Sequence, residues 1–337
     1  MVAKRIGQFL ISLIPAFLML ALEVVVMFAT MFIRTIVAVV SGEVSFDNVA
    51  AYVNALSGRS DFLILYILIF QSFAAISFGL FYVFSINGKH VSNPFKTFSL
   101  KSVPALIMLF SGVEIMISCL LLTLYEIIPN IMQGYSDMMS QSGLTDMTVL
   151  STVATLIIAP VAEEFVFRGI TMKLACRMTK KFWVANTIQA LIFGLAHLNP
   201  VQGIYAFALG LILGYVVKKY DSLLASMIGH CVFNFAGTYL VMWVFGDEET
   251  TVSVARLVFV AMCAIIFALA GALIVRGDKK TIIGSQKFDK EQTMIYEIAN
   301  SPKVRENCAP PVNPSEQPST DTKTEEDASA DTERNGD

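Results

Sequence analysis

Eight long apolar stretches constrain the fold of this chain of 337 residues more than any other feature. A helix needs about 20 apolar residues to cross the hydrocarbon core of a bilayer. Stretches of this length favour helices, which satisfy every backbone hydrogen bond within the segment. The candidate spans cover residues 9–40, 62–86, 103–128, 149–170, 183–197, 201–217, 222–243 and 252–275. The sequence therefore predicts an all-α, polytopic membrane protein of about eight transmembrane helices.

The composition agrees with this fold class and restricts the partners. Charged residues make up 15% of the chain and hydrophobic residues 55%, whereas soluble domains carry about 25% charged residues. The basic residues are scattered and form no basic face, so no nucleic-acid partner is expected. The predicted partner at this point is the lipid bilayer.

Lysine and arginine gather in alternate loops, and this bias predicts the orientation in the membrane. Basic residues lie before the first span, in the loop between spans two and three, and in the loop between spans four and five. They also follow span six and span eight. The opposite loops are acidic, and only Arg59 departs from the pattern. We therefore expect an even number of spans with both termini in the cytoplasm.

The distribution of polar residues divides the chain into three predicted parts. Residues 1–148 hold three N-terminal spans, and residues 149–276 hold the remaining spans of the transmembrane core. Residues 277–337 are polar and rich in Pro, Glu, Asp, Ser and Thr, which predicts a disordered cytoplasmic tail. Within the core, spans 183–197 and 201–217 are short and nearly adjacent, so they can form a hairpin that need not cross the bilayer fully.

Two adjacent carboxylates, Glu163 and Glu164, interrupt the fourth span. A charged side chain at the bilayer centre costs about 2.5–3.5 kcal/mol even on a lenient scale, so such a residue indicates a functional site. Glu164 and Arg168 are four residues apart and can pair along one helix face. This pairing leaves Glu163 as the freer carboxylate, which suits a general base or acid. We interpret Glu23 and Glu114, two further glutamates within spans, as structural residues that are hydrogen-bonded inside the bundle.

Two later spans carry histidines, each with a companion one helical turn away. His230 is followed four residues later by Asn234, and His197 is preceded four residues earlier by Phe193. Glu163 and His197 could polarise a water for attack on a peptide carbonyl, with Asn234 donating to the developing oxyanion. Alternatively, Glu163, His197 and His230 bind zinc with an open fourth position. No H-E-x-x-H motif occurs, which excludes the ordinary zincin helix.

The chain thus carries three short motifs in order: Glu163-Glu164-x-x-x-Arg168, Phe193-x-x-x-His197 and His230-x-x-x-Asn234. Together they resemble the motifs of the CPBP (CAAX protease and bacteriocin-processing, or Abi) intramembrane proteases, over residues 149–243. The resemblance implies an eight-helix membrane fold with a catalytic cavity open toward the cytosol. It implies Glu163 as the water-activating residue and His197 as its partner. His230 and Asn234 would stabilise the oxyanion or bind a metal.

The resemblance assigns lesser roles to the remaining motif members. Glu164 and Arg168 are carried over as motif residues, with a structural interpretation favoured, and Phe193 is expected to form part of the wall. Zinc is a candidate cofactor, because the family pattern is compatible with a metal or with a mechanism based on glutamate alone. Bacterial members are associated with peptide maturation, bacteriocin self-immunity and protein processing, which favours a multi-pass protein of a bacterial plasma membrane.

The sequence therefore predicts an intramembrane endopeptidase, with residues 149–276 as its catalytic core, that hydrolyses a peptide bond near the cytoplasmic face. Its predicted partner is a peptide or protein substrate that enters from the membrane or from the cytoplasmic side. Three alternatives stay open at this point. A proton-coupled transporter could use Glu163 and His230 as a relay. A non-catalytic membrane protein with a binding or immunity role could keep the motifs for stability, and a membrane scaffold could use the same residues to bind a metal.

Overall fold

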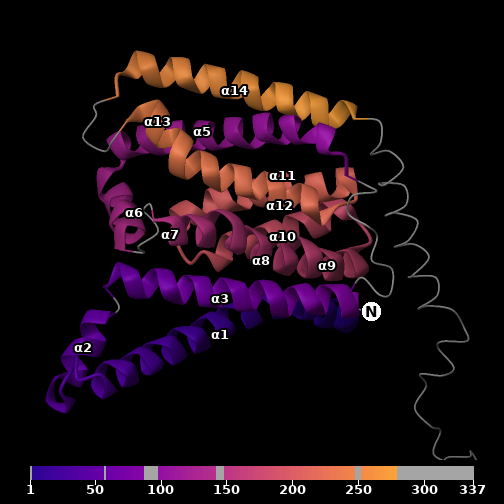
Figure 1. Cartoon of the computed structure of the whole chain (residues 1–337). Coiled ribbons are helices and arrows are strands. Elements are labelled where there is room, and N and C mark those ends of the chain that lie inside the picture. The colour runs from indigo at the N-terminus through magenta and orange to yellow at the C-terminus, as the bar shows by residue number, and fades with distance from the viewer. Residues whose placement is uncertain (1, 57, 87–97, 142–147, 247–251, 279–337) are drawn as a thin grey trace, which may run out of the picture. The chain divides into compact units, whose positions relative to one another are not determined.

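The computed structural model describes residues 2–56, 58–86, 98–141, 148–246 and 252–278 (Figure 1). These residues form helices, turns and short connections, and no strand occurs among them, which confirms the all-α prediction. Seven helices of the described part are long and apolar enough to cross a membrane. They cover Phe9–Val40, Ser60–Ile86, Leu100–Ile127, Val149–Thr179, Pro200–Tyr220, Leu223–Phe245 and Val254–Gly277.

An eighth apolar helix, Phe182–Ala196, has only 15 residues. The polytopic membrane fold is thus confirmed, and the fifth predicted span is the short one, as its sequence length indicates. The orientation of the termini and the division into three parts stay predictions. The tail expected to be disordered lies outside the described residues from position 279 onward.

The first part of the chain forms three long helices, α1, α3 and α5, together with shorter ones. Its elements are α1 (Val2–Val40), the 3₁₀ helix η1 (Phe46–Asn48), α2 (Val49–Leu56), α3 (Ser60–Phe81), the π-helix η2 (Tyr82–Ile86), the 3₁₀ helix η3 (Leu100–Ser102), α5 (Val103–Ile127) and α6 (Pro129–Gln141). The 39 residues of α1 extend over about 58 Å. This length exceeds the roughly 30 Å of bilayer hydrocarbon, so α1 must tilt or project beyond it.

In the second part of the chain, three π-helical turns interrupt the α-helices. Its elements are α7 (Val149–Val153), η4 (Ala154–Ile158), α8 (Ala159–Glu164), η5 (Phe165–Thr171), α9 (Met172–Thr179), α10 (Phe182–Ala196), α11 (Pro200–Tyr220), α12 (Leu223–Phe235), η6 (Ala236–Leu240), α13 (Val241–Phe245) and α14 (Val254–Gly277). The three η elements are π-helices. Such wide turns are rare and often occur at functional sites.

Two pairs of helices in the bundle pack with their backbones in contact, because glycine leaves room for it. Helices α5 and α14 run alongside each other (Figure 1), and a Cβ added at Gly112 would lie only 2.6 Å from the backbone nitrogen of Ala268. In the hairpin of α10 and α11, a Cβ at Gly194 would lie 2.5 Å from the carbonyl oxygen of Gly203. Small residues allow this close approach in membrane bundles. The close packing of α10 and α11 holds the turn between them, which follows His197, in place.

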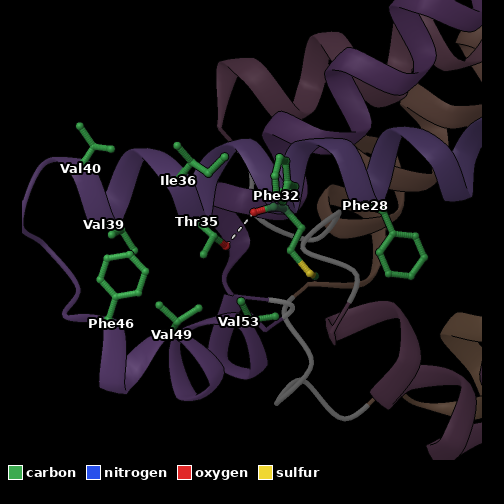
Figure 2. Close-up of a pocket in the computed structure, with 10 residues that line it drawn as sticks. Phe28, Phe32, Thr35, Ile36, Val39, Val40, Phe46, Val49 and Val53 are labelled. Carbon is green, nitrogen blue, oxygen red and sulfur yellow. Dashed lines mark hydrogen bonds between the residues drawn. The ribbon is translucent and has the colours of Figure 1, made fainter.

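An apolar cavity of about 600 Å³ lies between the second half of α1 and the short helices that follow it (Figure 2). Its lining is apolar apart from Thr35, whose hydroxyl donates to the carbonyl of Met31 at 2.8 Å. The lining residues are Phe28, Met31, Phe32, Thr35, Ile36, Val39, Val40, Phe46, Val49 and Val53. This cavity contains none of the predicted site residues.

The segment with the two adjacent glutamates is enclosed by four other helices. Helix α8 packs against α3 and α12, while the following turn η5 packs against α1 and α10. The segment that holds the glutamates therefore packs against helices from both the first and the second part of the chain.

Candidate active site

Pro160 at the start of α8 explains the wide turn before the glutamates. The backbone N–H of Ala159 donates to the carbonyl of Ala154, five residues earlier, as in a π-helix. The next carbonyl, that of Thr155, would accept from residue 160 in the same pattern, but proline has no N–H. The Thr155 carbonyl is therefore left without its helical donor. Such a group is costly inside a bilayer unless another donor reaches it.

Asn234 on α12 supplies that donor. Its side-chain nitrogen donates to the Thr155 carbonyl at 3.0 Å. The bond links α12 to the wide turn just before the glutamates, so Asn234 has a structural role in this conformation. An amide nitrogen carries two hydrogens, and the second one remains for a ligand. The oxyanion role predicted for Asn234 thus stays a prediction.

Glu164, Arg168 and His230 form a buried hydrogen-bonded group. The carboxylate oxygen Oε1 of Glu164 accepts from Arg168 Nη1 at 2.8 Å, and both side chains are 0% exposed. The same oxygen lies 3.0 Å from Nδ1 of His230, whose side chain is 4% exposed. The predicted pairing of Glu164 with Arg168 is present. The contact with His230, from a helix 66 residues away, was not predicted.

The bond to Glu164 determines what the other nitrogen of His230 can do. A carboxylate only accepts, so Nδ1 of His230 carries a hydrogen, and in a neutral imidazole with this tautomer Nε2 is an acceptor. This Nε2 lies 3.7 Å from Oε2 of Glu163. Glu163 is the more accessible glutamate, with a side chain 19% exposed. The two glutamates therefore have different environments, as their adjacent positions on a helix require.

Phe193 forms an aromatic wall behind the histidines. Its ring packs edge-on against the rings of His197 and His230, with centroids 4.9 Å and 5.8 Å away. The Arg168 guanidinium carbon lies 4.2 Å from the centroid of the Phe193 ring, a favourable cation–π geometry. The ring also packs edge-on against Phe167. These contacts agree with the predicted wall.

His197 stands at the end of α10, where the chain turns into α11. Its Nδ1 lies 2.8 Å from the carbonyl oxygen of Phe193; because a carbonyl only accepts, Nδ1 donates and Nε2 is an acceptor. The ring lies within electrostatic range of Glu163 and His230. The next residue, Leu198, has a positive φ of 54°, which is unfavourable for a side chain with a Cβ. Strain of this kind is often found beside functional residues.

The residues predicted to bind zinc do not form a complete ligand set. Among the described residues, no three His, Cys, Asp or Glu side chains group as ligands of one ion. Glu163 and His230 offer two nearby donor atoms, but three protein ligands are usual at a catalytic zinc. The donor set as arranged does not fit zinc, and the mechanism proposed below uses only the groups of the chain. Zinc stays a prediction, which metal analysis of the purified protein would test.

Two residues of the first part of the chain also belong to the surroundings of the site. Glu23 on α1 accepts a hydrogen bond from the Tyr66 hydroxyl on α3 at 3.1 Å, and it lies close enough to Glu163 for the carboxylates to repel each other. The expectation of a hydrogen-bonded Glu23 is confirmed. Its proximity to Glu163 was missed, because no local spacing links residues so far apart in the sequence. The only available signal was an acidic residue within an apolar span.

Glu114 lies in a different part of the bundle. Its Oε1 accepts from Ser118 Oγ at 3.1 Å on the same helix, α5, and a Cβ at Gly237 would come within 2.8 Å of it. The side chain is buried, at 8% exposed. The structural interpretation of Glu114 agrees with this environment.

A comparison with protein families identifies the region that contains these residues. Residues 145–236 match the family model described as type II CAAX prenyl endopeptidase, Rce1-like. This part of the chain is an Rce1-like domain. The Rce1-like domain contains all seven predicted site residues, so the family predicted from the three motifs is confirmed. Searches of curated proteins and of solved structures returned no match.

The Rce1-like domain supports an intramembrane peptidase of this family in a multi-pass membrane protein. It extends from the segment before α7 to the first residue of η6 and thus includes the turn from α10 to α11. Glu23 and Tyr66 lie outside it, on helices that pack against the domain.

Proposed function

We propose that the chain is an intramembrane endopeptidase in which Glu163 and His230 together activate a water. The observation that carries the proposal is the separation of 3.7 Å between Glu163 Oε2 and His230 Nε2. This is too long for a direct hydrogen bond. A water about 2.8 Å from each atom completes a triangle and can donate one hydrogen to each.

The proposed chemistry follows from this arrangement. A water that donates to both acceptors has its lone pairs directed away from them, toward a peptide carbonyl carbon in the site. As the oxygen–carbon bond forms, Glu163 takes one proton, and the carbonyl oxygen becomes an oxyanion. Glu163 then gives the proton to the leaving nitrogen, and the carbon–nitrogen bond breaks. General acid–base catalysis of this kind contributes about 10²–10⁴-fold to the rate.

The surrounding groups hold this arrangement in place. Glu164 fixes the His230 ring by accepting from Nδ1, and Arg168 neutralises the charge of Glu164. The free hydrogen of the Asn234 amide is the proposed donor to the oxyanion. His197, with an acceptor at Nε2, is proposed as a second partner of Glu163 in polarising the water. We also propose that cleavage occurs near the cytoplasmic face and serves peptide maturation or bacteriocin self-immunity.

The test compares cells that produce the wild type with cells that produce Glu163→Gln. Mass spectrometry of protein termini is expected to find termini with the wild type that Glu163→Gln lacks. Cleavage of a substrate identified in this way should fall at least about 100-fold in the variant. Glu114→Gln, which removes another buried membrane carboxylate, is the control and should keep the wild-type termini. Identical sets of termini in all three, with each protein folded, would contradict the proposal and favour a non-catalytic binding or immunity role.

A further inference from the structure

Helices α1 and α3 form the side of the site that carries no motif of the Rce1-like domain. Helix α3 packs against α8, which holds Glu163, and α1 packs against η5, α9 and α10. Glu23 and Tyr66 lie on these two helices and join them through the hydrogen bond of 3.1 Å. Glu23 and Tyr66 therefore lie on the two helices that border the segment of Glu163.

Glu23 is not a satisfied, enclosed carboxylate. Its side chain is only partly buried, whereas its partner Tyr66 is 7% exposed. One hydroxyl donor leaves most of the acceptor capacity of a carboxylate unused. Within the described residues, no Lys, Arg or His side chain lies within 4.0 Å of the Glu23 carboxylate. A membrane carboxylate in this situation is expensive unless a ligand uses it.

The charges around the site do not balance. Glu164 and Arg168 neutralise each other at 2.8 Å. Glu163 and Glu23 remain, and they repel each other. Among the described residues, the one basic side chain within 4.0 Å of either carboxylate is His230, at 3.7 Å from Glu163. A cation placed between the two carboxylates would relieve this repulsion and recover part of the cost of holding them in a membrane.

We propose that Glu23, held by Tyr66, binds a positively charged group of the substrate close to the scissile bond. The group is a lysine or arginine side chain or a free amino terminus. This inference rests on the proposed function and names its substrate class: peptides with a basic group beside the bond that is cut. Glu23 is then a specificity-determining residue outside the Rce1-like domain.

The test uses the full chain in lipid nanodiscs and quenched fluorescent decapeptides that carry arginine, glutamine or leucine at each position in turn. The wild type is expected to cleave peptides with arginine near the scissile bond most efficiently. In Glu23→Gln, the ratio of kcat/KM for arginine and glutamine peptides should fall roughly tenfold to a hundredfold. The change should lie mainly in KM. Glutamine keeps an acceptor for Tyr66, so the link between α1 and α3 is preserved.

Two further variants separate charge from structure. Tyr66→Phe removes the hydroxyl but keeps the carboxylate, so it should reduce the ratio less than Glu23→Gln does. Glu114→Gln removes a carboxylate elsewhere in the bundle and should leave the ratio unchanged. An unchanged preference in Glu23→Gln, or a wild type that prefers neutral peptides, would overturn the inference.

Binding without turnover distinguishes this inference from the proposed function. Labelled arginine and glutamine peptides are titrated against wild type and Glu23→Gln, and binding is followed by fluorescence anisotropy. If the wild type binds arginine peptides preferentially, Glu23→Gln does not, and neither cleaves any peptide, the cation site stands and the peptidase proposal fails. If peptides are cleaved but bind without regard to charge, the peptidase proposal stands and the cation site fails.

Discussion

Replacing Asn234 by leucine tests whether this side chain stabilises the wide turn before the glutamates. The change removes the donor to the Thr155 carbonyl, now 3.0 Å away, and puts an apolar side chain of similar size in its place. Because Pro160 has no N–H and Ala159 donates to Ala154, that carbonyl has no helical donor to return to. The variant should therefore be less stable than the wild type.

The expected loss is about 1–2 kcal/mol. An unsatisfied buried acceptor costs about 1–3 kcal/mol, whereas side-chain hydrogen bonds measured within membranes average about 0.6 kcal/mol and reach about 1.7 kcal/mol. The absence of a backbone donor at residue 160 places this bond toward the upper end of the membrane values. Reversible unfolding in detergent, followed by circular dichroism, measures the difference.

A second substitution, Pro160→Ala, makes the prediction specific. Alanine restores an N–H that can donate to the Thr155 carbonyl, so Asn234→Leu should cost less in this background. The coupling energy of the double-mutant cycle should be at least about 0.5 kcal/mol. An equal loss from Asn234→Leu in both backgrounds would refute the argument that Asn234 replaces the missing proline donor.

The same cycle separates the two roles of Asn234. If Pro160→Ala restores stability to Asn234→Leu but not the wild-type rate of cleavage, the second amide hydrogen of Asn234 acts in the reaction. If stability and the rate recover together, Asn234 acts through the wide turn alone. The rate is measured on the substrate identified from the protein termini.

Three further predictions concern groups around the site. Arg168→Met leaves Glu164 buried without its cation and should cost about 3–5 kcal/mol of stability, while adding Glu164→Gln should recover much of the loss; denaturant unfolding of both variants measures this. Leu198→Gly relieves the positive φ of 54° and should stabilise the protein by about 1 kcal/mol. The same exchange at the helical, exposed Leu195 should destabilise it by a similar amount, and comparing the two melting temperatures tests both. Phe193→Leu loses the ring beneath the Arg168 guanidinium and should lower stability by about 1–2 kcal/mol, with a lower cleavage rate.

Local features of the sequence predicted the helices and the contacts within one helix. The length of each apolar stretch predicted the spans, since the bilayer sets a minimum length for a helix. The short fifth span was visible as a stretch of 15 residues, and α10 has that length. The pairing of Glu164 with Arg168 follows from helical spacing, because residues four apart lie on one face.

The π-helical turns of the fourth span were not predicted. A regular α-helix was expected through the fourth span, but the structure has π-helical turns on both sides of α8. Pro160 was the available signal for the first of them, since it removes one backbone donor. The sequence contains no comparable signal for η5.

The chain by itself determined which residues are available for chemistry: membrane carboxylates, two histidines with companions one turn away, and the order of the three motifs. Only the tertiary structure decided which of them meet. Glu164 bonds to His230, while Glu163 lies opposite the other nitrogen of the same ring, and Glu23 from the distant helix α1 bonds to Tyr66 on α3. The physical reason is that helical periodicity specifies the faces of a single helix, whereas contacts between helices depend on how side chains and backbones pack together.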